Sequence, residues 1–169
     1  IESLKTRSNQ LPSGILELRS QLVYHLGIRE EDIPFVGELL QVRSEDKEWE
    51  GALERLLYGF GISMLVPDRH YRLVSEFVNA HKLQDKQNRG IRLEYFRVPA
   101  ESKLYHTSDD DLSPSSAVSK IDIKPGTPFY NWLEKELIRR FNLQCVSLEE
   151  FQNVSDGITK EGQIKTGRL

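Results

Sequence analysis

Apolar residues recur with two different periods along the chain, and each change of period marks an expected element. The stretch from Phe35 to Val42 is short and almost wholly apolar, which is typical of a strand covered on both faces. A helix follows, with a polar start at 44–47 and Gly59 as its left-handed closing residue. Its apolar positions are Trp49, Ala52, Leu53, Leu56 and Leu57. A second extended run from Ile62 to Val66 completes a strand-helix-strand unit, which predicts a right-handed crossover and an at least partly parallel sheet.

Two more helices and one strand are expected around this unit. Residues 13–26 carry apolar side chains at steps of three and four, and Gly27 closes that helix. Asp68 is expected to cap a helix with an apolar face. That face comprises Tyr71, Val74, Phe77 and Val78. Residues 91–98 alternate as a strand that begins half exposed and ends with both faces apolar.

The second part of the chain repeats this plan without repeating the sequence. A strand at 121–123, a helix opened by Thr127 and Pro128, and a strand at 144–146 are followed by a short helix with a capping-box pattern. The end of the chain, 158–166, reads as a hairpin that turns at Glu161 and Gly162. The expected organisation is an N-terminal helical segment (1–33), a first half (34–98), a solvated linker (99–117) and a second half (118–169).

Composition restricts the classes of function. The 169 residues are 38% hydrophobic and 29% charged, with a mean hydropathy of -0.50 and no apolar run near the length of a membrane span. Cys145 is the single cysteine, so an internal disulfide is excluded and the cytoplasm is the expected compartment. The net charge of -3 argues against a dedicated nucleic-acid binder. Because the chain begins at Ile1 and ends in TGRL, we expect a piece of a longer protein.

No catalytic or cofactor-binding constellation stands out. The sequence lacks a phosphate-binding loop, and no glycine-rich turn follows a strand. The four histidines, at 25, 70, 81 and 106, match no zinc spacing, and consecutive aspartates at 109–111 cannot all face one ion. Cys145 lies in an expected buried strand rather than on an exposed turn. We therefore expect no metal, no cofactor and no catalytic residue, and a small hydrolase or transferase at the acidic loop and Cys145 is the disfavoured alternative.

Basic residues form the one charged feature with a functional interpretation. Candidate DNA contacts are Lys82, Lys86, Arg89 and Arg92 around one turn and strand, and Lys160 and Lys165 beside the last turn. With Tyr95 and Phe96 nearby, such cations can hold phosphates and stack bases. A solvated face balanced by Asp85 and Glu94 is the favoured explanation, with weak, salt-sensitive DNA contact as a secondary property and a DNA-binding module as the alternative function.

A long ordered series of segments carries a resemblance to a known family. The segments are VGELLQV, WEGALERLLYGFG, ISMLVP, DRHYRLVSEFV, IRLEYFRV, PFYNWLEKELIRRF and ITKEGQIKTG, which together cover 34–167. The series resembles the hinge domain of SMC-family chromosome-organising ATPases, most closely the SMC-like subunit of Wadjet (JetC or MksB-type) plasmid-defence complexes. The resemblance implies an α/β fold of two pseudo-repeated strand-helix-strand-helix-strand halves with mixed sheets. It also places the first helix where a coiled-coil arm joins the hinge; an ordinary surface helix is the alternative.

The resemblance further implies a homodimer without chemistry of its own. In the family two copies join edge strand to edge strand, and edges left open in a sheet need such a cover. The segment TKEGQIKTG resembles the one beside the dimer contact, although the family's true SMC hinges have a denser run of glycines there. The implied interface residues are Gly157, Ile158, Gly162, Ile164 and Gly167. The implied parent is a DNA loop-extruding ATPase of an anti-plasmid complex, with kleisin-type and nuclease subunits, no membrane association, and ATPase heads outside this chain.

Overall fold

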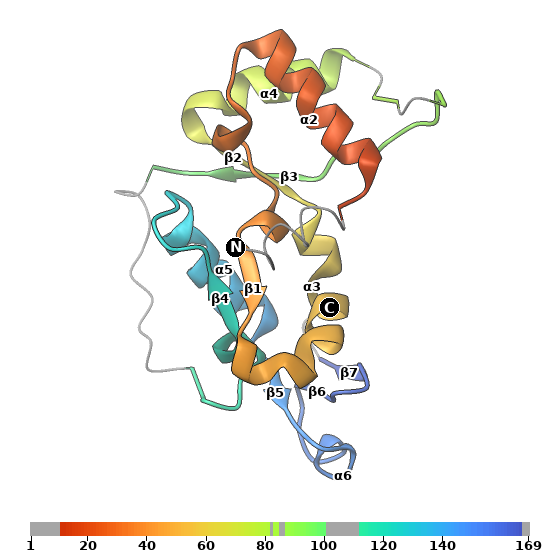
Figure 1. Cartoon of the computed structure of the whole chain (residues 1–169), viewed down its shortest axis with the longest axis vertical. Coiled ribbons are helices and arrows are strands. Elements are labelled where there is room, and N and C mark those ends of the chain that lie inside the picture. Colours follow the sequence, from red (N-terminus) through yellow and green to blue (C-terminus); the bar gives the residue numbers. More distant parts are fainter. Residues whose placement is uncertain (1–10, 82, 85–86, 101–111, 167–169) are drawn as a thin grey trace. The chain divides into compact units, whose positions relative to one another are not determined.

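The computed structural model describes residues 11–81, 83–84, 87–100 and 112–166, which form two compact units (Figure 1). Unit 1 is built from residues 1–39 and 59–103, and unit 2 from 40–58 and 104–169. The helices and strands are α2 (Ser13–Leu26), β1 (Leu40–Val42), α3 (Glu50–Gly61), β2 (Met64–Pro67), α4 (Asp68–Ala80), β3 (Tyr95–Val98), β4 (Ile121–Ile123), α5 (Tyr130–Phe141), β5 (Gln144–Cys145), α6 (Leu148–Phe151), β6 (Gly157–Ile158) and β7 (Ile164–Lys165).

Unit 1 packs the helices α2 and α4 beside a small sheet (Figure 1). Gly27 ends α2 in the left-handed conformation at a φ of 66°, with its N–H donating to the Val23 carbonyl at 3.1 Å. The sheet pairs β2 with β3 in parallel, Met64 opposite Tyr95. The buried core includes Leu18, Leu22, Ile33, Phe35, Met64, Val66 and Val74. The apolar stripes expected on both helices therefore cover one common core.

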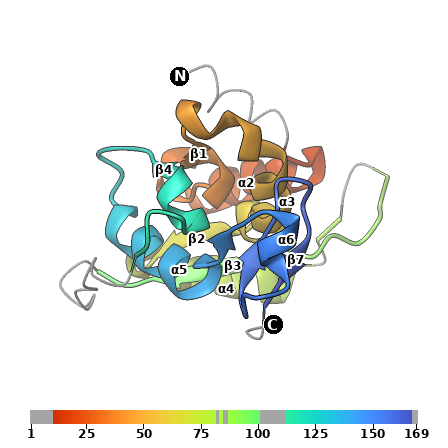
Figure 2. The ribbon, with the colours of Figure 1, turned by 90° about the horizontal axis from the view of Figure 1, so that it is seen from below.

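Unit 2 holds two small sheets. β1 pairs antiparallel with β4, with Leu40 opposite Ile123 (Figure 2). β5, β6 and β7 form a second sheet (Figure 1), in which β5–β6 is parallel and β6–β7 antiparallel. The buried side chains of the unit include Trp49, Leu53, Val118, Trp132, Leu133, Leu137, Leu143 and Ile158. Parallel and antiparallel pairs thus occur together in a mixed α/β fold, the class that the sequence predicts.

The expected strand at 35–42 and its crossover are wrong in detail. A 3₁₀ turn, Val36–Glu38, interrupts the strand, and the Glu38 carboxylate folds back to accept the Phe35 N–H at 2.8 Å. Only residues 40–42 continue as β1, and they pair with β4 rather than with β2. The crossover prediction fails because β1 and β2 belong to different sheets. Gly59 also does not close α3, which continues to Gly61.

The units interleave along the sequence, whereas the expected halves are consecutive. Residues 40–58 belong with unit 2 because β1 has its hydrogen-bonding partner there, although the sequence pattern groups them with 34–98. Of the expected linker, 101–111 lies outside the described residues, and Ser116 and Ala117 near its end are buried. The structure places Pro67 at the N-cap and Asp68 as the first residue of α4, where its carboxylate accepts from Nε of Arg97 at 2.6 Å. The expected elements after residue 120 match the observed ones closely, including the Ser147 cap of α6.

Two glycines in α3 offer a test of this fold. A Cβ added at Gly51 or Gly59 meets no atom within 4 Å, and neither residue has a positive φ. We expect Gly51→Ala and Gly59→Ala each to raise the free energy of unfolding by about 0.5–1 kcal/mol, because alanine restricts the unfolded chain. Urea denaturation measures the change.

Gly157→Ala is the matched control. A Cβ there would lie 2.6 Å from Cγ2 of Val154, so this variant is expected to lower the free energy of unfolding. Equal effects of all three substitutions would contradict the described packing.

Candidate dimer interface

The outer side of β3 is an open strand edge in unit 1. The Met64 N–H donates to the Glu94 carbonyl at 2.9 Å, which fixes which residues of the parallel ladder face β2. Because the direction of backbone groups alternates along a strand, the N–H and C=O of Tyr95 and Arg97 point away from β2. Within the described part of the chain, no backbone group pairs with them. β3 therefore presents two residues whose backbone can extend the sheet.

The other edge of this sheet is already covered. The Val36 N–H donates to the Ser63 carbonyl at 2.9 Å, and the Leu65 N–H donates to the Pro34 carbonyl at 2.8 Å. The segment 34–36 thus runs along the side of β2 opposite β3. Among the described residues of unit 1, β3 alone leaves this sheet open to a partner strand.

Side chains hold β3 in place on both faces. Arg97 donates from Nε to Oδ1 of Asp68 at 2.6 Å, and its guanidinium carbon lies 5.2 Å from the centroid of the Tyr71 ring. The rings of Tyr71 and Tyr95 are 5.9 Å apart. On the other face the Phe96 ring lies 5.6 Å from that of Phe60. The edge is consequently attached to α4 and to the core before any partner binds.

Among the described residues, the outer side of β7 is an open edge of the three-stranded sheet in unit 2. The Thr159 N–H donates to the Gln163 carbonyl at 3.0 Å, and Ile158 lies opposite Ile164 in the antiparallel ladder. The alternation places the backbone N–H and C=O of Ile164 on the side away from β6. The opposite edge of this sheet is covered, because the Cys145 N–H donates to the Ser115 carbonyl at 2.8 Å.

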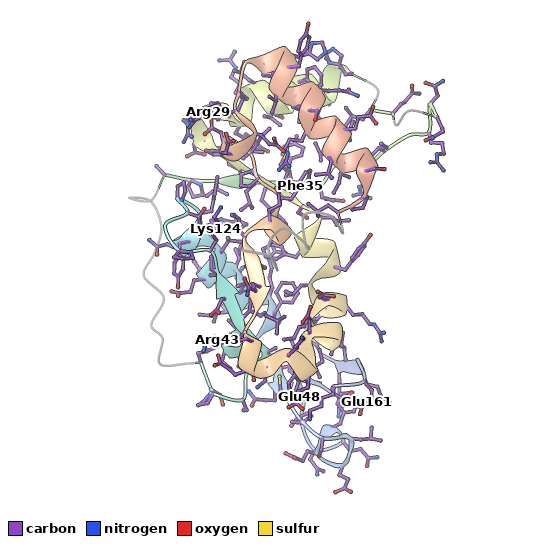
Figure 3. All side chains as sticks on the ribbon, viewed as in Figure 1. Arg29, Phe35, Arg43, Glu48, Lys124 and Glu161 are labelled. Carbon is purple, nitrogen blue, oxygen red and sulfur yellow. The ribbon has the colours of Figure 1, made fainter. Side chains whose placement is uncertain are left out.

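The glycines of the terminal segment are explained within unit 2. Gly162 turns the β6–β7 hairpin at a φ of 95°, and a Cβ there would lie 2.5 Å from Nη1 of Arg55. Arg55 donates to the carbonyl of Glu161, a residue labelled in Figure 3, at 3.5 Å. Gly157 has no room for a Cβ beside Val154. Both glycines therefore lie against side chains of their own unit.

The structure describes four of the five expected interface residues, and Gly167 lies outside the described residues. Ile158 is 0% exposed and belongs to the central strand β6, so its side chain supports the hairpin from the core. Ile164 is partly exposed on the edge strand, and Gly162 lies at the turn before it. Tyr95 and Arg97 are not among the interface residues that the sequence singles out, because alternation reveals a strand but not which of its edges stays open.

The expected DNA contacts have local partners. Arg92 lies 2.9 Å from Glu94, and Arg89 donates to Gln87 at 3.2 Å. Lys160 Nζ lies 2.9 Å from Glu48, which is labelled in Figure 3. Lys165 donates to the carbonyls of Phe151 and Gln152 at 3.4 and 3.3 Å. Lys82 and Lys86 lie outside the described residues, and the other four cations divide between the two units.

The described residues bring together no group of three or more histidine, cysteine or acidic side chains able to hold a metal ion. Burial raises the pKa of the Cys145 thiol to about 11, which leaves little thiolate at neutral pH. His106 and the aspartates at 109–111 lie outside the described residues. Of the helices in the described ranges, none has the length and hydropathy needed to cross a bilayer.

Comparison with solved structures identifies the fold as that of SMC hinge domains. The hinge of Geobacillus stearothermophilus SMC, crystallised as an asymmetric dimer, matches 98% of this chain with a TM-score of 0.60 and 14% identity. The folded elbow of cohesin matches 99% with a TM-score of 0.60 and 17% identity. The Pyrococcus furiosus Smc hinge domain with an extended coiled coil matches 99% with a TM-score of 0.54 and 18% identity.

This chain spans 64% of the Geobacillus chain, 24% of the cohesin chain and 68% of the Pyrococcus chain. No protein-family model and no curated protein sequence matches it. At these identities the likeness establishes the fold, which the sequence series predicts.

The raised thiol pKa predicts a slow reaction of Cys145 with iodoacetamide. At pH 8 we expect alkylation of the folded protein to be about tenfold slower or more than in urea, because the unfolded thiol has a pKa of about 8.5. The difference in rate should narrow as the pH rises toward the folded pKa. Mass spectrometry of the alkylated fraction over time gives both rates, and equal rates at pH 8 would rule out a raised pKa for this partly buried thiol.

Proposed function

We propose that this chain is a non-catalytic homodimerisation domain, the hinge of an SMC-like protein. The observation that carries the proposal is the pair of open edges, β3 in unit 1 and β7 in unit 2, on a chain with the SMC hinge fold. If β3 of one copy pairs with β7 of the other, two identical copies cover the β3 and β7 edges of both, and a two-fold axis relates the two contacts. The asymmetric dimer of the Geobacillus hinge supports self-association as the use of this fold.

Backbone pairing alone does not account for a stable dimer. Each hydrogen bond contributes only about 1 kcal/mol net, while association costs several times that amount. Tyr95, Arg97 and Ile164 supply few outward backbone groups. The proposed contact therefore includes apolar burial, and the partly exposed Ile164 side chain is the described edge residue that supplies it.

The proposal extends to the parent protein through the resemblance of the sequence. The ordered segments from VGELLQV to ITKEGQIKTG support an SMC-like ATPase of a Wadjet-type anti-plasmid complex that extrudes DNA loops in the cytoplasm. In that setting, kleisin-type and nuclease subunits are its partners, and the ATPase heads lie outside this chain. The hinge holds two such subunits together and needs no cofactor of its own.

Ile164→Glu tests the proposed contact. A carboxylate on the edge strand loses the apolar contact and must be desolvated, so the dimer dissociation constant should rise about 100-fold or more. Analytical ultracentrifugation at protein concentrations from about 1 to about 100 μM measures the constant, because the dimer fraction depends on concentration. Circular dichroism checks that the variant is folded.

Leu148→Glu on α6 is the matched control. It makes the same change at an apolar side chain that is 60% exposed in unit 2 but lies outside strand β7, so it should leave dimerisation unchanged. A wild-type chain that stays monomeric at tens of micromolar, or an unchanged constant for Ile164→Glu, would refute the proposal.

Weak DNA contact is a secondary proposal supported by Arg89 and Arg92, whose side chains are both exposed and which lie three positions apart in the sequence. With two phosphate contacts, the logarithm of the affinity should fall with the logarithm of salt concentration at a slope of about -2. Fluorescence anisotropy with a labelled duplex measures the slope. Arg89→Glu with Arg92→Glu should abolish binding, and salt-independent binding or binding retained by this variant would exclude the contact.

A further inference from the structure

Arg19 is a buried cation on the inner face of α2. Its side chain is 3% exposed, and it lies on the same helix face as Leu18 and Leu22. Nη2 donates to Oε1 of Glu30 at 2.6 Å and to Oε2 of Glu38 at 3.0 Å, while Nη1 donates to Oε1 of Glu38. The guanidinium carbon also lies 4.8 Å from the centroid of the Phe35 ring, which is labelled in Figure 3. One side chain of α2 thus binds two separate turns of the following segment.

Glu38 links Arg19 to the segment that runs beside the β2–β3 sheet. Oε1 that binds Arg19 also accepts the Phe35 N–H at 2.8 Å, and this bond holds the turn that interrupts the expected strand. The residues on either side of Phe35 are the ones that run along β2, through the Val36 N–H and the Pro34 carbonyl. β2 in turn pairs with β3 through the Met64 N–H. Direct contacts therefore lead from α2 to the strand that carries the open edge.

An arginine at this buried position adds little net stability. The free energy lost when its guanidinium leaves water offsets much of its attraction to carboxylates, and proteins with an apolar residue in such a position are often equally stable. A leucine at position 19 would continue the stripe of Ile15, Leu18 and Leu22. The bidentate Arg19–Glu38 pair has a geometric effect that an apolar contact lacks, because its two hydrogen bonds fix the orientation of the 34–38 segment relative to α2.

We propose that Arg19 is a positioning residue that couples α2 to the open edge of β3, so that displacement of α2 changes the affinity of the dimer. The inference rests on the proposed function for its effect on dimerisation, and it identifies how that contact is regulated. In the proposed hinge the arm joins the domain next to α2. The Arg19 network is then the route by which the position of the arm acts on the dimer contact, as coupling between two sites requires.

The test uses Arg19→Met combined with Glu38→Gln. The glutamine oxygen can still accept the Phe35 N–H, and no carboxylate is left unpaired at position 38, so the variant cuts the link to α2 while the turn keeps its bond. Two readouts apply. The first is amide hydrogen exchange at Val36, Met64 and Leu65, followed by NMR or mass spectrometry at about 1 μM, a low concentration that favours the monomer. The second is the dimer dissociation constant from ultracentrifugation.

We expect exchange at the three amides to rise tenfold or more and the dissociation constant to rise about tenfold, a change of about 1.4 kcal/mol. Two controls separate positioning from stability. Arg72→Met removes an arginine pair on α4 whose side chain is 89% exposed, and it should change neither readout. Val74→Ala destabilises the core of unit 1 without touching the network and should leave the dissociation constant within about twofold of wild type.

The results separate this inference from the proposed function. Unchanged exchange rates and an unchanged dissociation constant in the double variant would overturn the proposed coupling. A rise in the dissociation constant of Val74→Ala equal to that of the double variant would also overturn the coupling, because Arg19 would then act only by stabilising unit 1. If the wild-type chain proves monomeric, the proposed function fails by itself. The exchange readout, made on monomers, then still supports the coupling within unit 1 if the rates rise and overturns it if they do not.

Discussion

Backbone groups that the chain leaves unpaired at the ends of its sheets are the constraint on which this account depends. Each unit covers one edge of its open sheet with its own backbone, through Pro34–Val36 beside β2 and through Ser115 beside β5. The other edges, at β3 and β7, remain without a backbone partner among the described residues. Exposed N–H and C=O groups arranged along an extended strand favour pairing with another chain. A second copy supplies both complementary edges.

The sequence predicts the helices well because their signals are local. The stripe of α2, the left-handed Gly27, the helix α5 and the hairpin at Gly162 all depend on neighbours within a few residues, and the structure confirms each. Pairing between strands is not local. No residue near Leu40 indicates that its partner across the sheet is Ile123, which is more than eighty positions away. The sequence pattern therefore groups β1 with the wrong sheet.

At the candidate dimer interface, too, the residues that depend on distant contacts could not be predicted from the sequence. The resemblance directs attention to the glycines of the terminal segment, but Gly157 owes its identity to the neighbouring Val154 side chain and Gly162 to the φ of 95° at the hairpin turn. Arg19 looks like a surface cation in the sequence, because helical spacing alone does not reveal the two acidic turns that surround it. The backbone of Tyr95 and Arg97 becomes a candidate only once the register with β2 is known, since that register decides which groups face outward.

Amide exchange at Tyr95, Arg97 and Ile164, measured by NMR as the protein concentration rises from about 1 to about 100 μM, directly tests the proposed pairing of β3 and β7 with a second copy. We expect exchange at these three amides to slow in step with the dimer fraction, because each N–H gains a carbonyl acceptor from the partner. Amides already bonded within the sheets, such as that of Leu65, should show no comparable change. Dimerisation without protection of these three amides, or a chain that remains monomeric across the range, would contradict it.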